Sequence, residues 1–145
     1  MRARIDRASG LWPFLCLERA GEVAGFAYAY PHRDRASYRW SIDTSVYVKD
    51  GYRRAGIARR LYEALFEILR AQGYYNAFAG IALPNDVSVA FHHRLGFSDI
   101  GIYRNAGYKL GAWHDTIWMQ RELHPPNENP AEPIALRALP QITLR

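Results

Sequence analysis

A β-rich run that passes through a glycine-containing turn into an amphipathic helix most constrains how this chain folds. The run covers residues 45–48, the turn contains Gly56, and the helix is predicted over residues 57–70. Apolar residues recur along the helix at spacings of three and four, so one face is predicted to pack against a core. Gly73 follows as a residue suited to the helix C-cap. A strand followed at once by a packed helix indicates an α/β domain.

The turn ahead of this helix has the properties of a phosphate site. The first amides of a helix have no partner inside the helix, and the helix dipole makes that end positive. A glycine lets a ligand approach the backbone closely, and arginines add formal charge. The residues predicted to bind are Arg53, Arg54, Ala55, Gly56, Ile57, Ala58 and Arg59. The alternative is a basic helix start after an ordinary turn, because short glycine motifs recur by chance.

Size and composition indicate one soluble domain. The chain has 145 residues, of which 49% are hydrophobic and 23% charged. The net charge of +5 favours an anionic ligand but is too small to indicate nucleic acid by itself. The single cysteine, Cys16, lies in an apolar run, so we expect a buried thiol and a cytoplasmic setting. No apolar run approaches the roughly 18 residues of a membrane helix, and the N-terminus does not read as a signal peptide.

The remaining pattern completes a mixed, mostly antiparallel central sheet flanked by helices. Upstream of residue 49 we expect a helix end over residues 2–9, a hairpin of strands over 12–18 and 23–30, and a long strand over 38–48. Downstream of the main helix we expect a strand, a short helix, a strand, a glycine-punctuated loop and a last strand, over residues 75–81, 87–95, 97–103, 105–111 and 115–123.

The composition changes after residue 123. Five of the eight prolines lie beyond it. We therefore expect a domain over residues 1–123 and an extended or disordered tail over residues 124–145.

A second motif, over residues 85–97, begins at Asn85 and runs through a short aromatic helix to Leu-Gly-Phe. Alone, it is a capped helix with a glycine at its end. The two motifs, in this order and with a strand between them, resemble the acyl-CoA signatures of the GCN5-related N-acetyltransferases. That resemblance implies an acyl-CoA N-acyltransferase fold. It also implies contacts to the coenzyme from Asn85 and from the strand residues Val46, Tyr47 and Val48.

A closer resemblance covers most of the chain. Residues 24–29, 45–48, 80–86 and 106–115 look like phosphinothricin N-acetyltransferases, and the Gly-x-Trp-His-Asp segment at 111–115 is the most specific of them. The resemblance implies acetyl-CoA as the donor. It implies as acceptor a small amino acid or analogue such as phosphinothricin or the sulfone or sulfoximine of methionine.

The family's general base is a Glu on the strand that approaches the thioester, and here Asp43 holds the matching position. The alternative for Asp43 is a structural hydrogen bond. His114 is the second catalytic candidate, because a histidine titrates near neutrality and the adjacent Asp115 would orient the ring. The alternative is a structural histidine.

Further coenzyme contacts are expected from the short helix. The resemblance places His92 as a hydrogen-bond donor near the sulfur and Arg94 near the phosphates, and both have the alternative of a solvent-facing helix position. The loop at residues 31–38 borders the acceptor pocket in relatives, so Arg33, Arg35 or Tyr38 would hold a carboxylate there. The alternative is a solvated loop. No metal is predicted, because the histidines have no carboxylate or cysteine at a ligand-like spacing.

The function expected from these motifs is acetylation of a small-molecule amine. The alternatives are a truncated acyl-CoA-binding module without turnover and a nucleic-acid- or protein-binding domain, although no nucleic-acid motif is present. Relatives carry a longer N-terminus, and this chain is expected to lack their first strand and helix. A shorter chain would expose apolar sheet surface, so we expect a homodimer that binds neither nucleic acid nor membrane.

Overall fold

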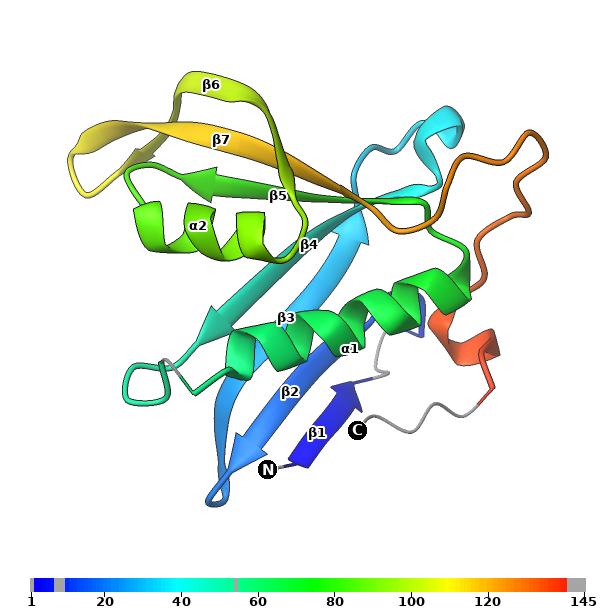
Figure 1. Cartoon of the computed structure of the whole chain (residues 1–145), viewed down its shortest axis with the longest axis horizontal. Coiled ribbons are helices and arrows are strands. Elements are labelled where there is room, and N and C mark those ends of the chain that lie inside the picture. The colour runs from blue at the N-terminus through cyan, green and yellow to red at the C-terminus, as the bar shows by residue number, and fades with distance from the viewer. Residues whose placement is uncertain (1, 7–9, 54, 141–145) are drawn as a thin grey trace.

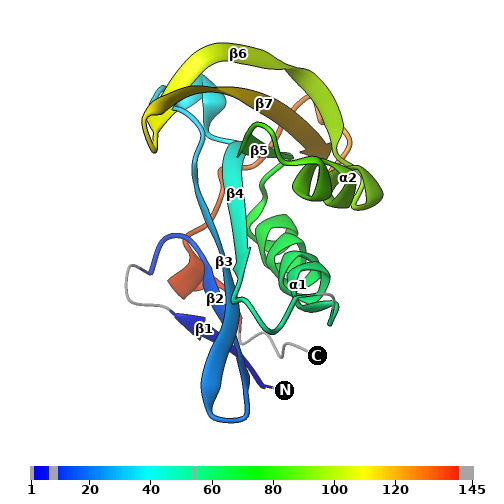
Figure 2. The same ribbon diagram turned by 90° about the vertical axis from the view of Figure 1, so that its left-hand side faces the viewer.

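The computed structural model describes residues 2–6, 10–53 and 55–140. Within them the chain forms a seven-stranded sheet in the order β1-β2-β3-β4-β5-β7-β6, and helices α1 and α2 pack on the same side of it (Figures 1 and 2). The elements are β1 (Arg2–Asp6), β2 (Phe14–Arg19), β3 (Glu22–Pro31), η1 (Ala36–Tyr38), β4 (Ser41–Val48), α1 (Ile57–Gln72), β5 (Asn76–Ala82), α2 (Asp86–Arg94), β6 (Ser98–Lys109), β7 (Ala112–Glu122) and η2 (Leu136–Ala138).

The expected fold class is confirmed. Every strand pair is antiparallel except β4 with β5, so the sheet is mixed and mostly antiparallel. The β2–β3 hairpin turns at Ala20 and Gly21, both of which have positive φ as a tight primed turn requires. Cys16 is buried, as expected.

Two expectations of local structure are wrong. The helix end expected at residues 2–9 is the strand β1, which pairs antiparallel with β2 from Arg2↔Glu18 to Asp6↔Phe14; residues 7–9 lie outside the described part. So short a run carries no decisive periodicity, and the open edge of β2 offers it a ladder. The loop expected at residues 105–111 is mostly strand, because β6 continues through a register shift between Tyr103 and Gly107.

The expected long strand at residues 38–48 is shorter. A 3₁₀ turn, η1, occupies Ala36–Tyr38, and β4 begins only at Ser41.

Helix α1 covers β2, β3 and β4 and builds the core with them (Figure 1). Its face at Leu61, Leu65 and Leu69 is completely or almost completely buried. The helix ends at Gly73, whose positive φ of 93° allows the backbone N–H groups of Gly73 and Tyr74 to reach the last helical carbonyls.

The C-terminal segment 124–140 contains the 3₁₀ turn η2 and otherwise no helix or strand. Leu136 is fully buried and belongs to the same core as α1. The buried Gln72 side chain donates to the carbonyls of Leu11 and Ile134, both at 3.0 Å, and ties the segment to the end of α1. Neither helix in the described part of the chain is long and apolar enough to span a membrane.

Gly25 of β3 lies where α1 packs tightly against the sheet. A Cβ there would lie 2.8 Å from the carbonyl oxygen of Tyr47 and 3.1 Å from the Ile57 side chain. We expect Gly25→Ala to lower the free energy of unfolding by about 1–3 kcal/mol, because backbone must move to admit the methyl group. Urea denaturation measures the change. The matched control is Gly101→Ala, where the methyl group meets nothing within 4 Å. Equal stability of the two variants would contradict this packing.

Candidate active site

The parallel pair of strands opens into a wedge. Strand β4 pairs with β5 only at Ser41↔Asn76, Ile42↔Ala77 and Asp43↔Phe78. Beyond that point the strands diverge, as Figure 1 shows, and in the described part no strand occupies the space between them. The backbone of β4 from Thr44 to Val48 therefore presents an unpaired edge. Such an edge binds extended ligands through main-chain hydrogen bonds. The predicted coenzyme residues Val46, Tyr47 and Val48 lie on it.

The buried residues Thr44, Tyr62 and His92 form hydrogen bonds on the sheet and between the two helices. The Thr44 hydroxyl donates to the Phe78 carbonyl at 3.1 Å, and the Tyr62 hydroxyl lies 3.1 Å from His92 Nε2. His92 Nδ1 lies 2.7 Å from the Ser88 carbonyl, so it donates there. Burial lowers the pKa of His92, which keeps the ring neutral, so its Nε2 accepts from the Tyr62 hydroxyl.

His92 therefore does not face solvent. Only 4% of the residue is exposed, so the helix-surface alternative is wrong. Both of its ring nitrogens are bound to protein groups, which ties α2 to α1.

Both helix N-termini lie at the carboxyl ends of the two parallel strands. This is where α/β sheets bind ligands. Helix α1 begins after Gly56, which has a positive φ of 74° and offers no side-chain cap. Helix α2 begins after Asn85, whose side chain accepts from the Ser88 backbone N–H at 3.2 Å. The capping alternative for Asn85 is thus realised in the structure.

The basic turn surrounds the uncapped end of α1. The first backbone bond of that helix is Arg60 N–H to the Gly56 carbonyl, at 3.1 Å. The preceding amides, including those of Ile57, Ala58 and Arg59, are the groups a helix leaves without an internal partner. The exposed guanidinium of Arg53 pairs with Asp50 at 3.0 Å. Of the other predicted residues, Ala55 and Gly56 are exposed, and Arg54 lies outside the described part.

Asp43 lies at the apex of the wedge and is paired with a histidine. Its Oδ1 is 2.6 Å from His32 Nδ1, and the ring of His32 stacks on Phe78 with centroids 4.3 Å apart. Partial burial raises the pKa of Asp43, and the hydrogen bond from His32 opposes that rise. The side chains remain 32% and 19% exposed respectively, so solutes can reach both.

His32 has no role predicted from the sequence, because it lies in the loop expected at residues 31–38. The antiparallel hairpin brings it beside Asp43, because Tyr30 lies opposite Asp43 and the His32 amide donates to the Ser41 carbonyl. Residues two apart on a strand share a face of the sheet, so His32 shares a face with Tyr30, which lies opposite Asp43. Alternation along β3 and β4 together would therefore have indicated the pair.

His114 does not join this pair. In the sheet, Phe78 of β5 pairs with Asp43 of β4 on one side and with Gln120 of β7 on the other. His114 lies six residues from Gln120 along β7. At about 3.3 Å per residue the separation is roughly 20 Å. The ring nitrogens of His114 lie 3.1 Å from the Leu83 carbonyl and 3.3 Å from the Lys109 carbonyl.

Asp115 does not hold the His114 ring either. Its carboxylate accepts from the Asn105 backbone N–H at 2.8 Å and from Arg104 at 3.0 Å, and these bonds lower its pKa. The Trp-His-Asp segment therefore braces the β6–β7 hairpin and the turn after β5.

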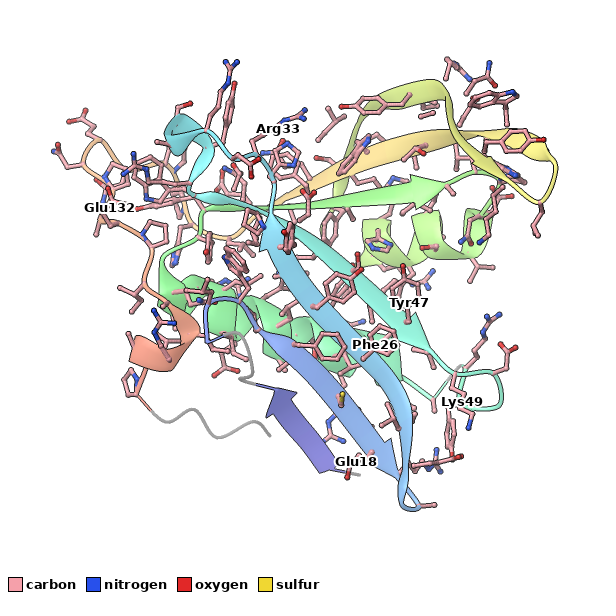
Figure 3. The ribbon with its side chains drawn as sticks, turned by 180° about the vertical axis from the view of Figure 1, so that it is seen from behind. Glu18, Phe26, Arg33, Tyr47, Lys49 and Glu132 are labelled. Carbon is pink, nitrogen blue, oxygen red and sulfur yellow. The ribbon has the colours of Figure 1, made fainter. Side chains whose placement is uncertain are left out.

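The remaining predicted positions lie on α2 and on the segment that joins β3 to β4, where Figure 3 labels Arg33. Arg94 is exposed at the last residue of α2, roughly 14 Å along the helix from Asn85. Arg33, Arg35 and Tyr38 line a cavity of about 380 Å³ between the β3–β4 loop and the C-terminal segment. Among the described residues no cluster of three His, Cys, Asp or Glu side chains is arranged to hold a metal ion.

Comparison with known proteins adds independent findings. Residues 2–118 match the family model described as "Acetyltransferase (GNAT) domain". The chain is 41% identical over 138 residues to a phosphinothricin N-acetyltransferase of Streptomyces viridochromogenes, covering 95% of this chain and 73% of that protein. It is 38% identical over 125 residues to an L-methionine sulfoximine/L-methionine sulfone acetyltransferase of Pseudomonas aeruginosa, covering 86% and 73%.

Solved structures agree with these relatives. A GNAT superfamily phosphinothricin acetyltransferase from Sinorhizobium meliloti, crystallised in complex with AcCoA, is 32% identical with a TM-score of 0.75, covering 88% of this chain and 72% of that one. A putative acetyltransferase from Salmonella typhimurium, solved with its cofactor acetyl-CoA, is 31% identical with a TM-score of 0.79, covering 86% and 72%.

Burial and the hydrogen bond from His32 change the pKa of Asp43 in opposite directions, and both effects can be measured. We expect its pKa to lie above the ordinary aspartate value, and His32→Gln to raise it further, because that variant removes the hydrogen bond and the charge that lower it. Carbon-13 NMR of the side-chain carboxyl across a pH series gives both values. Asp115 is the internal control, because its pKa is lowered and should not respond to His32→Gln. An Asp43 pKa below the ordinary value would contradict the burial of this pair.

Proposed function

Because the chain belongs to the acetyltransferase (GNAT) family, we propose that it acetylates the primary amine of a small amino acid or analogue, of the phosphinothricin or methionine sulfone/sulfoximine type. It is an acetyl-CoA-dependent N-acetyltransferase, as its relatives and the structures solved with acetyl-CoA indicate. The acceptor class rests on the printed activities of those relatives. The observation that carries the proposal is the wedge between β4 and β5, which has a half-buried carboxylate at its apex.

The wedge fits the coenzyme at both ends. Its diphosphate would lie against the uncapped N-terminus of α1, where the amides from Gly56 to Arg59 and the guanidinium of Arg53 supply donors and positive charge. Its pantetheine arm carries amide groups, and these would pair with the free edge of β4 from Val46 to Val48. The thioester would then lie toward the apex, where the β4 amides around Val46 polarise its carbonyl.

The apex supplies the base that the reaction needs. An amino group in neutral water is mostly ammonium, and it must lose a proton before its nitrogen can attack a carbonyl. Asp43 is placed to drive that loss, and the raised pKa of its carboxyl makes it a stronger base than an exposed aspartate. Its side chain is one methylene shorter than the family's glutamate, which leaves more space at the apex for the acceptor.

We expect Asp43→Asn to lower kcat at least about 100-fold while leaving the KM for acetyl-CoA unchanged, because it removes a base and not a coenzyme contact. Release of CoA thiol in the presence of a panel of amino acids, including methionine sulfone and phosphinothricin, measures the rate. The control is Asp99→Asn, at an exposed carboxylate on β6 that pairs with His93.

The panel also separates the two expected functions. Thiol release with at least one acceptor supports the enzyme. Acetyl-CoA binding by calorimetry with no release for any acceptor would contradict the proposal and support a binding module.

Gly56 tests the coenzyme site separately. Its positive φ of 74° is strained for any other residue, so Gly56→Ala should shift the turn and raise the Kd of acetyl-CoA about tenfold. Calorimetric titration gives the Kd. The control is Gly51→Ala, which carries a similar φ of 93° and equally open surroundings, but precedes the helix start. An equal loss of affinity in the two variants would argue against a binding role for the α1 N-terminus.

A further inference from the structure

Building on the proposed acetyl transfer, we propose that the base in this chain is a two-residue pair, in which the His32 imidazole takes the proton from the acceptor amine and the Asp43 carboxylate orients that imidazole. This scheme replaces Asp43 by His32 as the group that receives the proton. His32 is then the catalytic residue and Asp43 is a positioning residue that acts through it, so Asp43→Asn would still lower kcat.

The hydrogen bond between the two side chains determines which nitrogen is free. His32 Nδ1 lies 2.6 Å from Asp43 Oδ1, a distance typical of a charge-assisted bond, so Nδ1 carries the hydrogen and donates. A neutral imidazole then has its lone pair on Nε2. Among the described residues Nε2 has no protein partner. The nitrogen that can accept a proton is therefore the one left open.

Aromatic packing holds the ring at the apex of the wedge. It stacks on Phe78 at an interplanar angle of 18° and forms a T-shaped contact with Trp118, with centroids 5.9 Å apart. Phe78 is also the last residue of β5 that pairs with β4. The ring thus lies where the wedge begins. A base on the far side of the imidazole ring also reaches farther from the strand than the short Asp43 side chain does by itself.

The charges around the pair oppose the effect of burial on Asp43. The charged group that acts on Asp43 besides His32 is Arg33, which favours the carboxylate, while β5 and β7 present the uncharged Phe78 and Trp118. The indole N–H of Trp118 is buried without a hydrogen-bond partner in the described part of the chain. Proteins seldom leave such a donor unsatisfied.

The proton balance of the reaction is then complete. The acceptor ammonium gives one proton to Nε2, which leaves imidazolium paired with the Asp43 carboxylate. The amine lone pair forms the new C–N bond at the thioester carbonyl carbon. Collapse of the tetrahedral intermediate breaks the C–S bond, and the departing thiolate takes the second nitrogen proton. The products are the N-acetyl acceptor, CoA thiol and one proton, which the imidazolium returns to solvent.

The test compares His32→Gln with the unmodified chain, using one acceptor throughout so that its own titration is common to both. We expect kcat to fall about 100-fold with the KM for acetyl-CoA unchanged. We also expect the acid limb of kcat/KM to move to lower pH, because the remaining base is a carboxylate and not an imidazole. A variant with kcat within about twofold and the same acid limb would overturn the inference, although acetyl transfer itself would stand.

The chain offers a matched control. His93 forms a similar pair with Asp99, at 2.7 Å, but on the exposed end of α2. His93→Gln should leave both kcat and the pH profile unchanged. If His93→Gln lowers kcat as much as His32→Gln does, the loss of rate is not specific to the His32–Asp43 pair, and the inference is overturned.

A second measurement needs neither a variant nor turnover. Nitrogen-15 NMR of the unmodified chain identifies which ring nitrogen of neutral His32 carries the hydrogen. We expect Nδ1–H, and an Nε2–H form would overturn the inference whatever the activity. An unmodified chain with Nδ1–H that acetylates no acceptor would instead overturn the proposed function and, with it, the role of the pair in catalysis.

Discussion

The early end of one parallel ladder is the constraint on which the rest of the site depends. Strands β4 and β5 share only three residue pairs, and every functional feature is placed relative to the last of these, Asp43↔Phe78. Above that pair the two backbones separate and leave unpaired hydrogen-bonding groups, which an extended ligand can satisfy. Because each strand leads into a helix, the same separation directs the N-termini of α1 and α2 toward one opening.

The charge distribution follows the same geometry. Beneath the wedge the buried groups are polar but neutral, since burial lowers the pKa of His92 and raises that of Tyr62. At the mouth, α1 begins without a side-chain cap, and the guanidinium groups of Arg53 and Arg59 beside it pair with Asp50 and Glu63. The half-buried carboxylate of Asp43 lies at the apex.

The motifs could be predicted from sequence because their physics is local. A glycine with positive φ before an amphipathic helix, and an Asn that caps the next helix, act within a few residues, and the structure has both where they were expected. The wrong predictions concern positions that depend on pairing between strands distant in the sequence. The β1 segment is a strand because β2 has a free edge. Asp43 and His114 were the first and second catalytic candidates, but the strand register separates them by roughly 20 Å.

By itself the sequence determined the fold class, the order of the main elements and the position of the helix start that faces the wedge, because apolar spacing and glycine conformation are properties of short segments. Only the tertiary structure decided which side chains meet. The bond between His32 and Asp43 depends on the register of β3 against β4, and the ring's place on Phe78 depends on the pairing of β4 with β5. The residues in such contacts are separated along the chain by distances that follow no helical or strand periodicity. These contacts therefore exist only once the sheet has formed.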